Sequence, residues 1–302
     1  MYYLIKFLTL LFLCTKKYKI LNNLTYKLAR IKNKLIFNLL DKLPVSKTYK
    51  LSPPNKYMER IWICWLQGEE HAPKLVKCCI KSIQDSFPNH TITILTEQNI
   101  SEFLTLPDHV WNRFHNNEIS KTHFSDLLRM NLISQQGGLW IDATVFMTRP
   151  INNNFFNFDF NSLHHDSPSH YGVFSEFWIS YFFYAKPNNK LVQYCAQLLN
   201  EYTMKYPRFH DYFIMDYCIK KSINDCGMMD SLKELPVIGI NRFLLNNIAN
   251  QISNEHTMSL LQNDSIGIYK LNSKNIYKLS DSGKPTIYQK IVLNNCKLTD
   301  TH

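Results

Sequence analysis

Residues 121–149 read KTHFSDLLRMNLISQQGGLWIDATVFMTR, and this stretch decides the fold. Apolar residues recur through its first half at the spacing of one helix face, which predicts a helix. Ser120 or Thr122 is a suitable cap for the start of this helix. The pair Gly137–Gly138 predicts its end, because glycine accepts the left-handed backbone that helix ends favour.

Three charged residues stand in this otherwise apolar unit. Residues 139–147 predict a buried strand, which Asp142 interrupts. A carboxylate in a buried strand is costly unless it is paired or binds something. Asp126 and Arg129 are three positions apart and therefore share one helix face. Alone they favour an ion pair within the helix, but together with Asp142 and the glycine pair they favour a ligand site.

The preceding residues predict a strand–helix–strand unit. Residues 60–67 are an apolar strand, 74–87 form a helix that begins after Pro73, and 91–96 are a second strand. Such a unit places two parallel strands in one sheet, and open parallel sheets bind ligands at the carboxyl ends of their strands. We therefore predict an α/β, Rossmann-like fold with Asp142 near the ligand site.

The residues after 149 predict a mainly helical C-terminal part. Residues 152–170 are rich in Asn, Phe and His without periodicity, and we expect a long loop over the site. The other predicted elements are an aromatic strand over 176–185, helices over 188–206, 210–224 and 241–253, and strand-like pieces over 266–270 and 286–292.

Positive charge is concentrated at the N-terminus. The whole chain has 34 Lys and Arg against 24 Asp and Glu, a net charge of +10. Residues 1–60 hold thirteen of these bases and only Asp41 and Glu59 as acids, a net +11, so the rest of the chain sums to −1. A nucleic-acid binder would carry basic charge on its folded domain. The distribution instead indicates an anionic membrane surface as a partner, and no nucleic acid.

The same region has the pattern of a membrane-associating helical segment. Residues 2–14 are apolar, but as a helix they span only about 20 Å against about 30 Å of hydrocarbon. Residues 16–42 carry an apolar stripe among lysines, which suits a basic amphipathic helix lying in the membrane interface. The alternative is that this stripe packs on the protein's own core. A proline-containing linker follows, at Pro44 and Pro53–Pro54. The predicted units are an N-terminal segment and linker over 1–57 and a main domain over 58–302.

Two classes of nucleotide site are not supported by the sequence. Glycine occurs only 8 times, and neither GxGxxG nor GxxxxGK[ST] is present, which argues against a dinucleotide-type site and a P-loop. The 8 cysteines form no CxxC pair, which favours free thiols in a reducing compartment over a disulfide framework.

A spaced motif runs through the opening stretch, where Ser125-Asp-x-x-Arg129 is followed by Gly137-Gly-x-x-x-Asp142. Ile61–Gln67 with its acidic loop, and residues 88–100, add two further segments. These segments resemble the capsular polysaccharide synthesis family of glycosyltransferases. That family is related to glycosyltransferase family 32 and to the sugar-transferring domains of large clostridial toxins. A weaker likeness extends to residues 211–216 and 277–280.

The resemblance implies a GT-A fold, a nucleotide-sugar donor and retention of anomeric configuration. By position, Asp126 and Arg129 would hold hydroxyl groups of the donor sugar through charge-assisted hydrogen bonds. Asp142 would be the first acid of the DxD motif near the diphosphate, and Trp62 or Trp65 would lie near the base. The implied catalytic residues are Asp126, Arg129 and Asp142, and the implied donor-binding residues are Trp62, Trp65, Gln67, Ser125, Asp126, Arg129, Gly138, Asp142, Thr144 and Lys278.

The chain departs from the DxD motif at its second acid, which is Thr144. In related enzymes that acid coordinates Mg²⁺ or Mn²⁺, hard ions that prefer carboxylate oxygens. The resemblance thus implies Mn²⁺ or Mg²⁺ at Asp142 alone, held as a largely hydrated ion. The alternative is that Lys278, Lys284 or Lys290 offsets the charge of the diphosphate.

We therefore expect a peripheral, retaining glycosyltransferase at the cytoplasmic face of the bacterial inner membrane, acting in capsular polysaccharide or lipopolysaccharide synthesis. It would move a sugar from a nucleotide-sugar donor, which we expect to be a UDP-sugar. The acceptor would be a growing surface polysaccharide or a lipid-linked oligosaccharide. The alternative, which Thr144 keeps open, is a non-catalytic nucleotide- or sugar-binding subunit of a membrane polysaccharide assembly complex. Asp216 or Glu176 could lie near the acceptor, but we expect each to have a structural partner instead.

Overall fold

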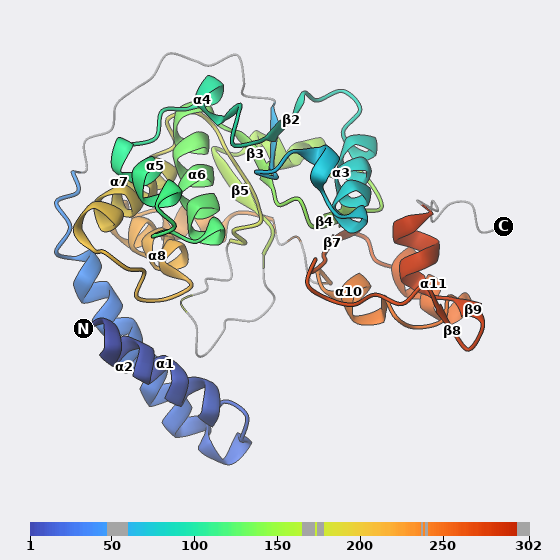
Figure 1. The fold of residues 1–302 in the computed structure, drawn as a ribbon, viewed down its shortest axis with the longest axis horizontal. Coiled ribbons are helices and arrows are strands. Elements are labelled where there is room, and N and C mark those ends of the chain that lie inside the picture. Colours follow the sequence, from blue (N-terminus) through green and yellow to red (C-terminus); the bar gives the residue numbers. More distant parts are fainter. Residues whose placement is uncertain (47–59, 165–172, 174–177, 237, 239–240, 295–302) are drawn as a thin grey trace.

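A five-stranded sheet lies at the centre of the computed structural model, which describes residues 1–46, 60–164, 173, 178–236, 238 and 241–294 (Figure 1). The strand order is β2-β1-β3-β6-β5, in which β1 pairs parallel with β2 and β3, whereas β6 runs antiparallel to both of its neighbours. The strands are β1 (Ile61–Cys64), β2 (Ile92–Leu95), β3 (Gly138–Ile141), β5 (Phe160–Ser162) and β6 (Phe182–Ala185).

The predicted strand–helix–strand unit and its parallel sheet are confirmed. Helix α3 (Lys74–Ser86) connects β1 to β2, and Ile61 is in register with Ile92 on one side and with Leu139 on the other. Because parallel strands end at the same edge of a sheet, the residues that follow β1 and β3 are brought together. This α/β, Rossmann-like arrangement positions the site.

One face of the sheet is covered by helices that bury its tryptophans. Trp62 and Trp140 point to this side and are at most 1% exposed, in one core with Leu128 and Leu198. In Figure 1 these helices lie together on one side of the sheet. They are α4 (Ile100–Phe103), α5 (Asp108–His115), α6 (Lys121–Gln136), α7 (Lys190–Lys205), α8 (Ile214–Asp225) and α9 (Met229–Lys233).

Helix α3 lies between the other face of the sheet and the C-terminal part. Val76 and Ile80 pack on the sheet, whereas Leu75 and Cys79 join a separate core with the C-terminal elements. A short ribbon of β4 (Val145–Met147) and β7 (Ile268–Lys270) belongs to this part. The other elements there are α10 (Leu244–Ile248), α11 (Glu255–Gln262), β8 (Ser280–Asp281), β9 (Lys284–Pro285) and a π-helix (Tyr288–Leu293).

Two predicted strands differ from the structure. The apolar run over 139–147 is not one strand, because a turn in which Val145 N donates to Asp142 O (2.9 Å) separates β3 from β4, and the two belong to different sheets. The piece over 286–292 is not a strand either. Its buried residues Ile291 and Val292 pack in the core beside α3 from a π-helix.

The described part of the segment expected to be a long loop over the site contains regular structure. The short helix η3 (Asn153–Asn157) and the edge strand β5 lie in it, and Phe155 and Leu163 are buried. The aromatic strand predicted over 176–185 is shorter, because β6 begins only at Phe182. Residues 165–172 and Glu176 lie outside the described residues.

The N-terminal region forms a helical hairpin that projects from the helical side of the domain (Figure 1). It consists of α1 (Tyr2–Thr15), the turn η1 (Lys19–Leu21) and α2 (Asn22–Leu40). The end of α2 joins the domain core through Ile36 and Leu40. Among the helices of the described residues, none is long and apolar enough to cross a membrane. The linker prolines Pro53–Pro54 and the predicted boundary after residue 57 lie outside the described residues.

Candidate active site

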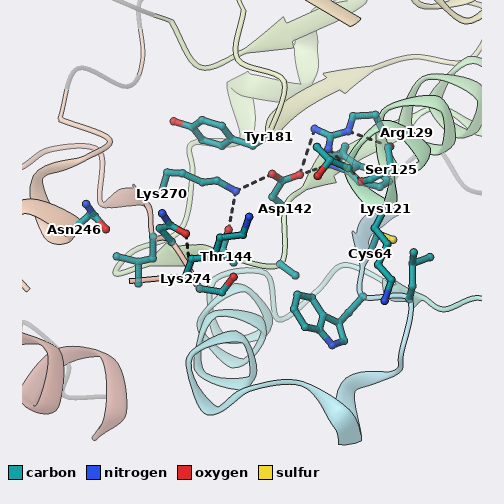
Figure 2. A pocket seen from close by; sticks show the side chains of 18 of the residues that line it. Cys64, Lys121, Ser125, Arg129, Asp142, Thr144, Tyr181, Asn246, Lys270 and Lys274 are labelled. Atoms are coloured by element: carbon teal, nitrogen blue, oxygen red, sulfur yellow. Dashed lines mark hydrogen bonds and ion pairs between the residues drawn. The ribbon is translucent and has the colours of Figure 1, made fainter. Parts of the chain in front are cut away.

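A cleft of about 840 Å³ opens at the edge of the sheet where β1 and β3 end (Figure 2). Its walls are built from the residues that follow these two strands, the first half of α6, and residues 270–274 of the C-terminal part. The carboxyl ends of parallel strands are where open α/β sheets bind ligands. The cleft therefore lies where the sequence predicted the site.

Local sequence signals position α6 beside this cleft. Ser120 caps the helix, since its side chain accepts a hydrogen bond from His123 N (3.2 Å), and Gly137 ends it with a φ of +67°. Ser125 and Arg129 are one turn apart and both line the cleft. The cap and the glycine end, which were predicted, thus fix the part of the helix that carries these side chains.

Arg129 is buried and held by several acceptors. Its Nη1 donates to Ser180 O (2.6 Å) and its Nε to Ser125 O (3.2 Å), and the guanidinium lies 5.0 Å from the ring centroid of Trp140. Nη1 is also 3.3 Å from Asp142 Oδ1. Burial lowers the pKa of Arg129, but the carboxylates of Asp142 and Asp126 outweigh it and raise the pKa above its ordinary value. This side chain is a fixed positive charge at the wall of the cleft.

Asp142 is the acidic centre of the site. Its Oδ1 accepts a hydrogen bond from Trp140 Nε1 (2.9 Å), and its Oδ2 accepts one from Lys270 Nζ (2.7 Å). Its backbone N donates to Tyr181 O (2.9 Å), which extends the pairing of β3 with β6 past the strand end. Burial raises the pKa of this carboxyl, but Lys270 and Arg129 outweigh it and hold the pKa well below its ordinary range. Asp142 is therefore ionised at neutral pH.

Lys270 lines the cleft, and the sequence did not reveal it as a candidate site residue. It ends β7 opposite Val145, and its Nζ donates to both Asp142 Oδ2 and Thr144 Oγ1, each at 2.7 Å (Figure 2). The pairing of β4 with β7 joins residues more than a hundred positions apart, so no local pattern marks this lysine. The strand-like piece over 266–270 was the one available signal.

Asp126 lies behind the cleft rather than in its wall. Its side chain is 3.5 Å from Arg129 and is nearly inaccessible to solvent. Burial raises the pKa of its carboxyl to about 7, although Arg129 opposes this shift. In this structure Asp126 contacts the guanidinium of Arg129, which lines the cleft, whereas the resemblance implied that Asp126 itself would hold sugar hydroxyls.

The structure separates the other predicted site residues into two groups. Trp65, Gln67 and Thr144 line the cleft together with Ser125, Arg129 and Asp142. Trp62 does not, because its side chain is fully buried in the core and its Nε1 donates to Gly137 O (2.9 Å).

Two further predicted residues lie away from the cleft wall. Gly138 is buried at the start of β3, where an added Cβ would be 2.5 Å from Arg60 O, so it serves close backbone packing. Lys278 is outside the cleft, 61% exposed at its side chain and 3.8 Å from Asp281. Asp216 is buried and accepts a hydrogen bond from Trp178 Nε1 (3.2 Å), which is the structural partner that we expected.

The residues around Asp142 do not fit a divalent cation. Mg²⁺ and Mn²⁺ prefer several oxygen ligands of which carboxylates are the strongest. Among the described residues that line the cleft, Asp142 is the one carboxylate. Lys270 and Arg129 contact its two oxygens, and the hydroxyl of Thr144 accepts a hydrogen bond from Lys270. No cluster of three His, Cys, Asp or Glu side chains suited to a metal occurs in the described part of the chain.

Comparison with known proteins identifies the family. The model of the capsular polysaccharide synthesis protein family matches residues 13–291. The chain belongs to this family. Membership supports the glycosyltransferase activity that the sequence predicted. A search of curated proteins found no match.

Among solved structures, the chain matches one described as the PaToxG glycosyltransferase. The two share 12% sequence identity with a TM-score of 0.40, and the match covers 71% of this chain and 84% of that one.

Proposed function

We propose that this protein is a retaining glycosyltransferase with a GT-A-like fold that takes a sugar from a UDP-sugar. The acceptor is a growing bacterial surface polysaccharide or a lipid-linked oligosaccharide. The observation that carries the proposal is the cleft at the carboxyl edge of β1 and β3, in which two cations, Arg129 and Lys270, flank Asp142. Family membership supports the polysaccharide product.

The lining of the cleft suits each part of a nucleotide-sugar. Trp65 follows β1 and offers an aromatic face on which a base can stack. Arg129 and Ser125 offer hydrogen-bond donors for sugar hydroxyls and phosphate oxygens. Preorganised cations stabilise the charge that develops on a departing nucleoside diphosphate, and such electrostatic stabilisation is usually the largest single contribution to catalysis.

A panel of nucleotide-sugars, scored by release of free nucleotide, tests the activity. We expect one donor to be turned over by the wild-type protein, Asp142→Ala to abolish turnover, and Arg129→Ala to lower it steeply. Lys81→Met, which changes an exposed lysine on α3, is the matched control and keeps wild-type activity. Unchanged activity in both Asp142→Ala and Arg129→Ala would contradict the proposal. Nucleotide binding without turnover of any donor would point instead to the non-catalytic subunit.

The stereochemical outcome has its own test. The expectation that configuration is retained rests on the family resemblance. Retention requires the acceptor hydroxyl to attack the anomeric carbon from the face that the diphosphate leaves. The anomeric proton coupling of the first product formed, measured by NMR before mutarotation, is expected to match that of the donor. A product of opposite configuration contradicts retention while leaving glycosyl transfer intact.

The helical hairpin supports the predicted membrane association. The apolar stripe predicted over residues 16–42 is divided: Leu28 and Leu39 of α2 are buried, whereas Leu24 and Ile31 of α2 are exposed, and Ile20 in η1 is 93% exposed. Both readings of the stripe thus apply, each to a part of the helix. Exposed apolar side chains also run along α1. They are Tyr3, Leu4, Phe7, Leu10 and Leu13.

We propose that this outer face and the hairpin tip lie in an anionic bilayer surface, at the cytoplasmic face of the inner membrane. Lys16, Lys17 and Lys19 surround the tip beside the exposed Tyr18 and Ile20. Apolar side chains that enter the interface and lysines that meet anionic headgroups are the two components of peripheral membrane binding. A chain held in this way keeps its cleft near a lipid-linked or surface-bound acceptor.

Sedimentation with vesicles tests this membrane contact. We expect binding to vesicles of phosphatidylglycerol and phosphatidylethanolamine, and weak binding to phosphatidylcholine alone. Phe7→Ser/Leu10→Ser and Lys16→Glu/Lys17→Glu each weaken binding at least about tenfold, since each apolar side chain and each lysine contributes on the order of 1 kcal/mol or more. Lys81→Glu, a charge reversal on α3, leaves binding unchanged. Equal binding to both kinds of vesicle, or none to either, contradicts the proposal.

A further inference from the structure

We propose that the ammonium group of Lys270, and not a divalent cation, neutralises the diphosphate of the donor, so that sugar transfer by this protein is independent of metal. The inference rests on the proposed function, because it concerns the same cleft. It also replaces the expectation that Lys278, Lys284 or Lys290 supplies such a charge, since none of these three lines the cleft.

The position of Lys270 is the first observation. Its Nζ lies 2.7 Å from Asp142 Oδ2 and 2.7 Å from Thr144 Oγ1. These are the first and third side chains of the Asp-Ala-Thr sequence that corresponds to DxD. The ammonium therefore contacts the side chains at both positions that are acids in a DxD motif (Figure 2).

The charge of the cleft is the second observation. A metal in a two-carboxylate motif leaves no net positive charge from the three groups together. Here Asp142 contributes one negative charge, and Lys270 and Arg129 contribute two positive charges within 3.3 Å of it. Asp126 lies 3.5 Å from Arg129, but burial raises the pKa of its carboxyl to about 7, so near neutral pH it offsets only part of the positive charge. The cluster is thus positive without any ion, and the replacement of the second acid by Thr144 is what leaves this excess. Such a cluster attracts a diphosphate and repels a divalent cation.

The rigidity of Lys270 is the third observation. Its backbone N donates to Arg242 O (2.7 Å), and the neighbouring Leu271 N donates to Thr144 O (2.9 Å). Its Nζ lies 5.1 Å from the ring centroid of Tyr181, and the side chain is 22% exposed. A cation fixed in this way needs no reorganisation when charge develops on the leaving group, which is the condition for electrostatic catalysis.

The role of Lys270 can be placed in a balanced reaction. The bond between the anomeric carbon and the phosphate oxygen breaks, and its electron pair stays on the diphosphate. The acceptor oxygen forms the new bond to the anomeric carbon, and its proton passes to the departing diphosphate. Lys270 and Arg129 remain protonated throughout, and they stabilise the oxygen that receives the electron pair.

Calorimetric titration of the full-length protein with UDP, GDP and ADP tests the inference, with each titration carried out in EDTA and in Mn²⁺. We expect the preferred diphosphate to bind with the same Kd under both conditions. Lys270→Met removes the charge at nearly constant volume, and it weakens binding by about 10–100-fold, the loss that follows removal of a charged hydrogen bond. Lys270→Arg keeps most of the affinity, and Lys81→Met keeps all of it.

A second variant keeps the inference testable if Lys270→Met fails to fold. Thr144→Asp/Lys270→Ala restores the two carboxylates of DxD and removes the resident ammonium. This double variant is expected to bind the diphosphate only when Mn²⁺ or Mg²⁺ is present, whereas the wild type binds it with the same Kd in the presence and absence of the metal.

Two results would overturn the inference, and they are distinguishable. Wild-type binding that is lost in EDTA and restored by Mn²⁺, with Lys270→Met equal to wild type, refutes the role of Lys270 and leaves the glycosyltransferase proposal standing. No binding of any nucleoside diphosphate under either condition overturns the proposed function together with the inference.

Discussion

At the scale of single residues, the contacts of Arg129 depend on the shape of its guanidinium group as well as on its positive charge. The guanidinium contacts Ser180 O, the backbone and hydroxyl of Ser125, and Asp142. A lysine keeps the positive charge but cannot satisfy these separate directions at once. We expect Arg129→Lys to lower kcat/KM at least about tenfold, the loss that follows one or more missing charged hydrogen bonds. Steady-state kinetics with the active donor measure this, and wild-type kcat/KM in the lysine variant contradicts it.

Asp126 provides a prediction on pH and stability. Burial raises its pKa from 3.8 to about 7, so the folded state binds its proton more tightly than the unfolded state does. The stability that this group contributes is fully present below about pH 4 and is lost as the pH rises to about 7. Asp126→Asn has no such group. The free energy of unfolding of the wild type, minus that of the variant, should therefore fall between pH 4 and 7, by up to about 4 kcal/mol.

Urea titrations at several pH values measure this difference. Asp216, whose pKa burial raises to about 6, acts on the charge of Asp126, so the same comparison is repeated in an Asp216→Asn background, where only Asp126 titrates. A difference that stays constant from pH 4 to 7 contradicts a buried, proton-binding Asp126.

At the scale of elements, a glycine that follows α6 and a glycine that follows α8 provide a matched comparison. Gly138 has a φ of +100°, and an added Cβ would be 2.5 Å from Arg60 O and 2.8 Å from Trp62 Nε1. Gly227 has a φ of +66° with no atom within 4 Å of an added Cβ. Gly227→Ala is expected to cost about 1–2 kcal/mol from backbone strain alone. Gly138→Ala is expected to cost about 1–3 kcal/mol more, because of the clash.

Chemical denaturation of the two variants tests this comparison, with the free energy of unfolding as the readout. If Gly138→Ala and Gly227→Ala lose the same free energy of unfolding, the clash of an added Cβ with β1 at Gly138 contributes nothing, which contradicts the prediction.

Elements with strong local signals were predicted from the sequence. Periodicity, the cap at Ser120 and the glycine pair place α6 and β3, and the strand–helix–strand pattern around α3 places β1 and β2. Because the topology of parallel strands then fixes which ends meet, the sequence also predicts that Trp65 and Asp142 share one cleft. Side chains alternate along a strand and its extension, which is why Trp62 and Trp65 have different surroundings.

Contacts between distant elements could not be predicted in this way. The ribbon of β4 and β7 depends on packing against α3, so the sequence did not show that Lys270 meets Asp142. Residues 286–292 have the composition of a strand, yet tertiary packing overrides that preference and a π-helix forms. Burial of Asp126 behind Arg129 likewise follows from the packing of whole helices.

At the scale of the whole molecule, the hairpin is fastened to the domain by a buried ion pair. Lys32 on α2 donates to Asp211 Oδ2 (2.8 Å), and the side chain of Asp211 is only 3% exposed. Lys32→Ala leaves that carboxylate buried without its cation, with the hydrogen bond from Phe213 N still in place (2.9 Å), at a cost of about 3–5 kcal/mol. Lys34→Ala, two positions on in the same helix and exposed, should cost within about 0.5 kcal/mol.

Thermal and urea unfolding of the two variants measure the difference. If Lys32→Ala unfolds like Lys34→Ala, the ion pair does not hold the hairpin in place. If Lys32→Ala is destabilised but still binds anionic vesicles, the ion pair is needed to hold the hairpin on the domain but not for the contact of the hairpin with lipid.

A crystal structure of the protein with UDP, grown in the presence of Mn²⁺, tests the central claim most directly. The account predicts the diphosphate against Lys270 and Arg129, the uracil beside Trp65, and no metal ion between Asp142 and Thr144. A nucleotide bound away from this cleft, or a Mn²⁺ ion that displaces Lys270 from Asp142, would contradict it.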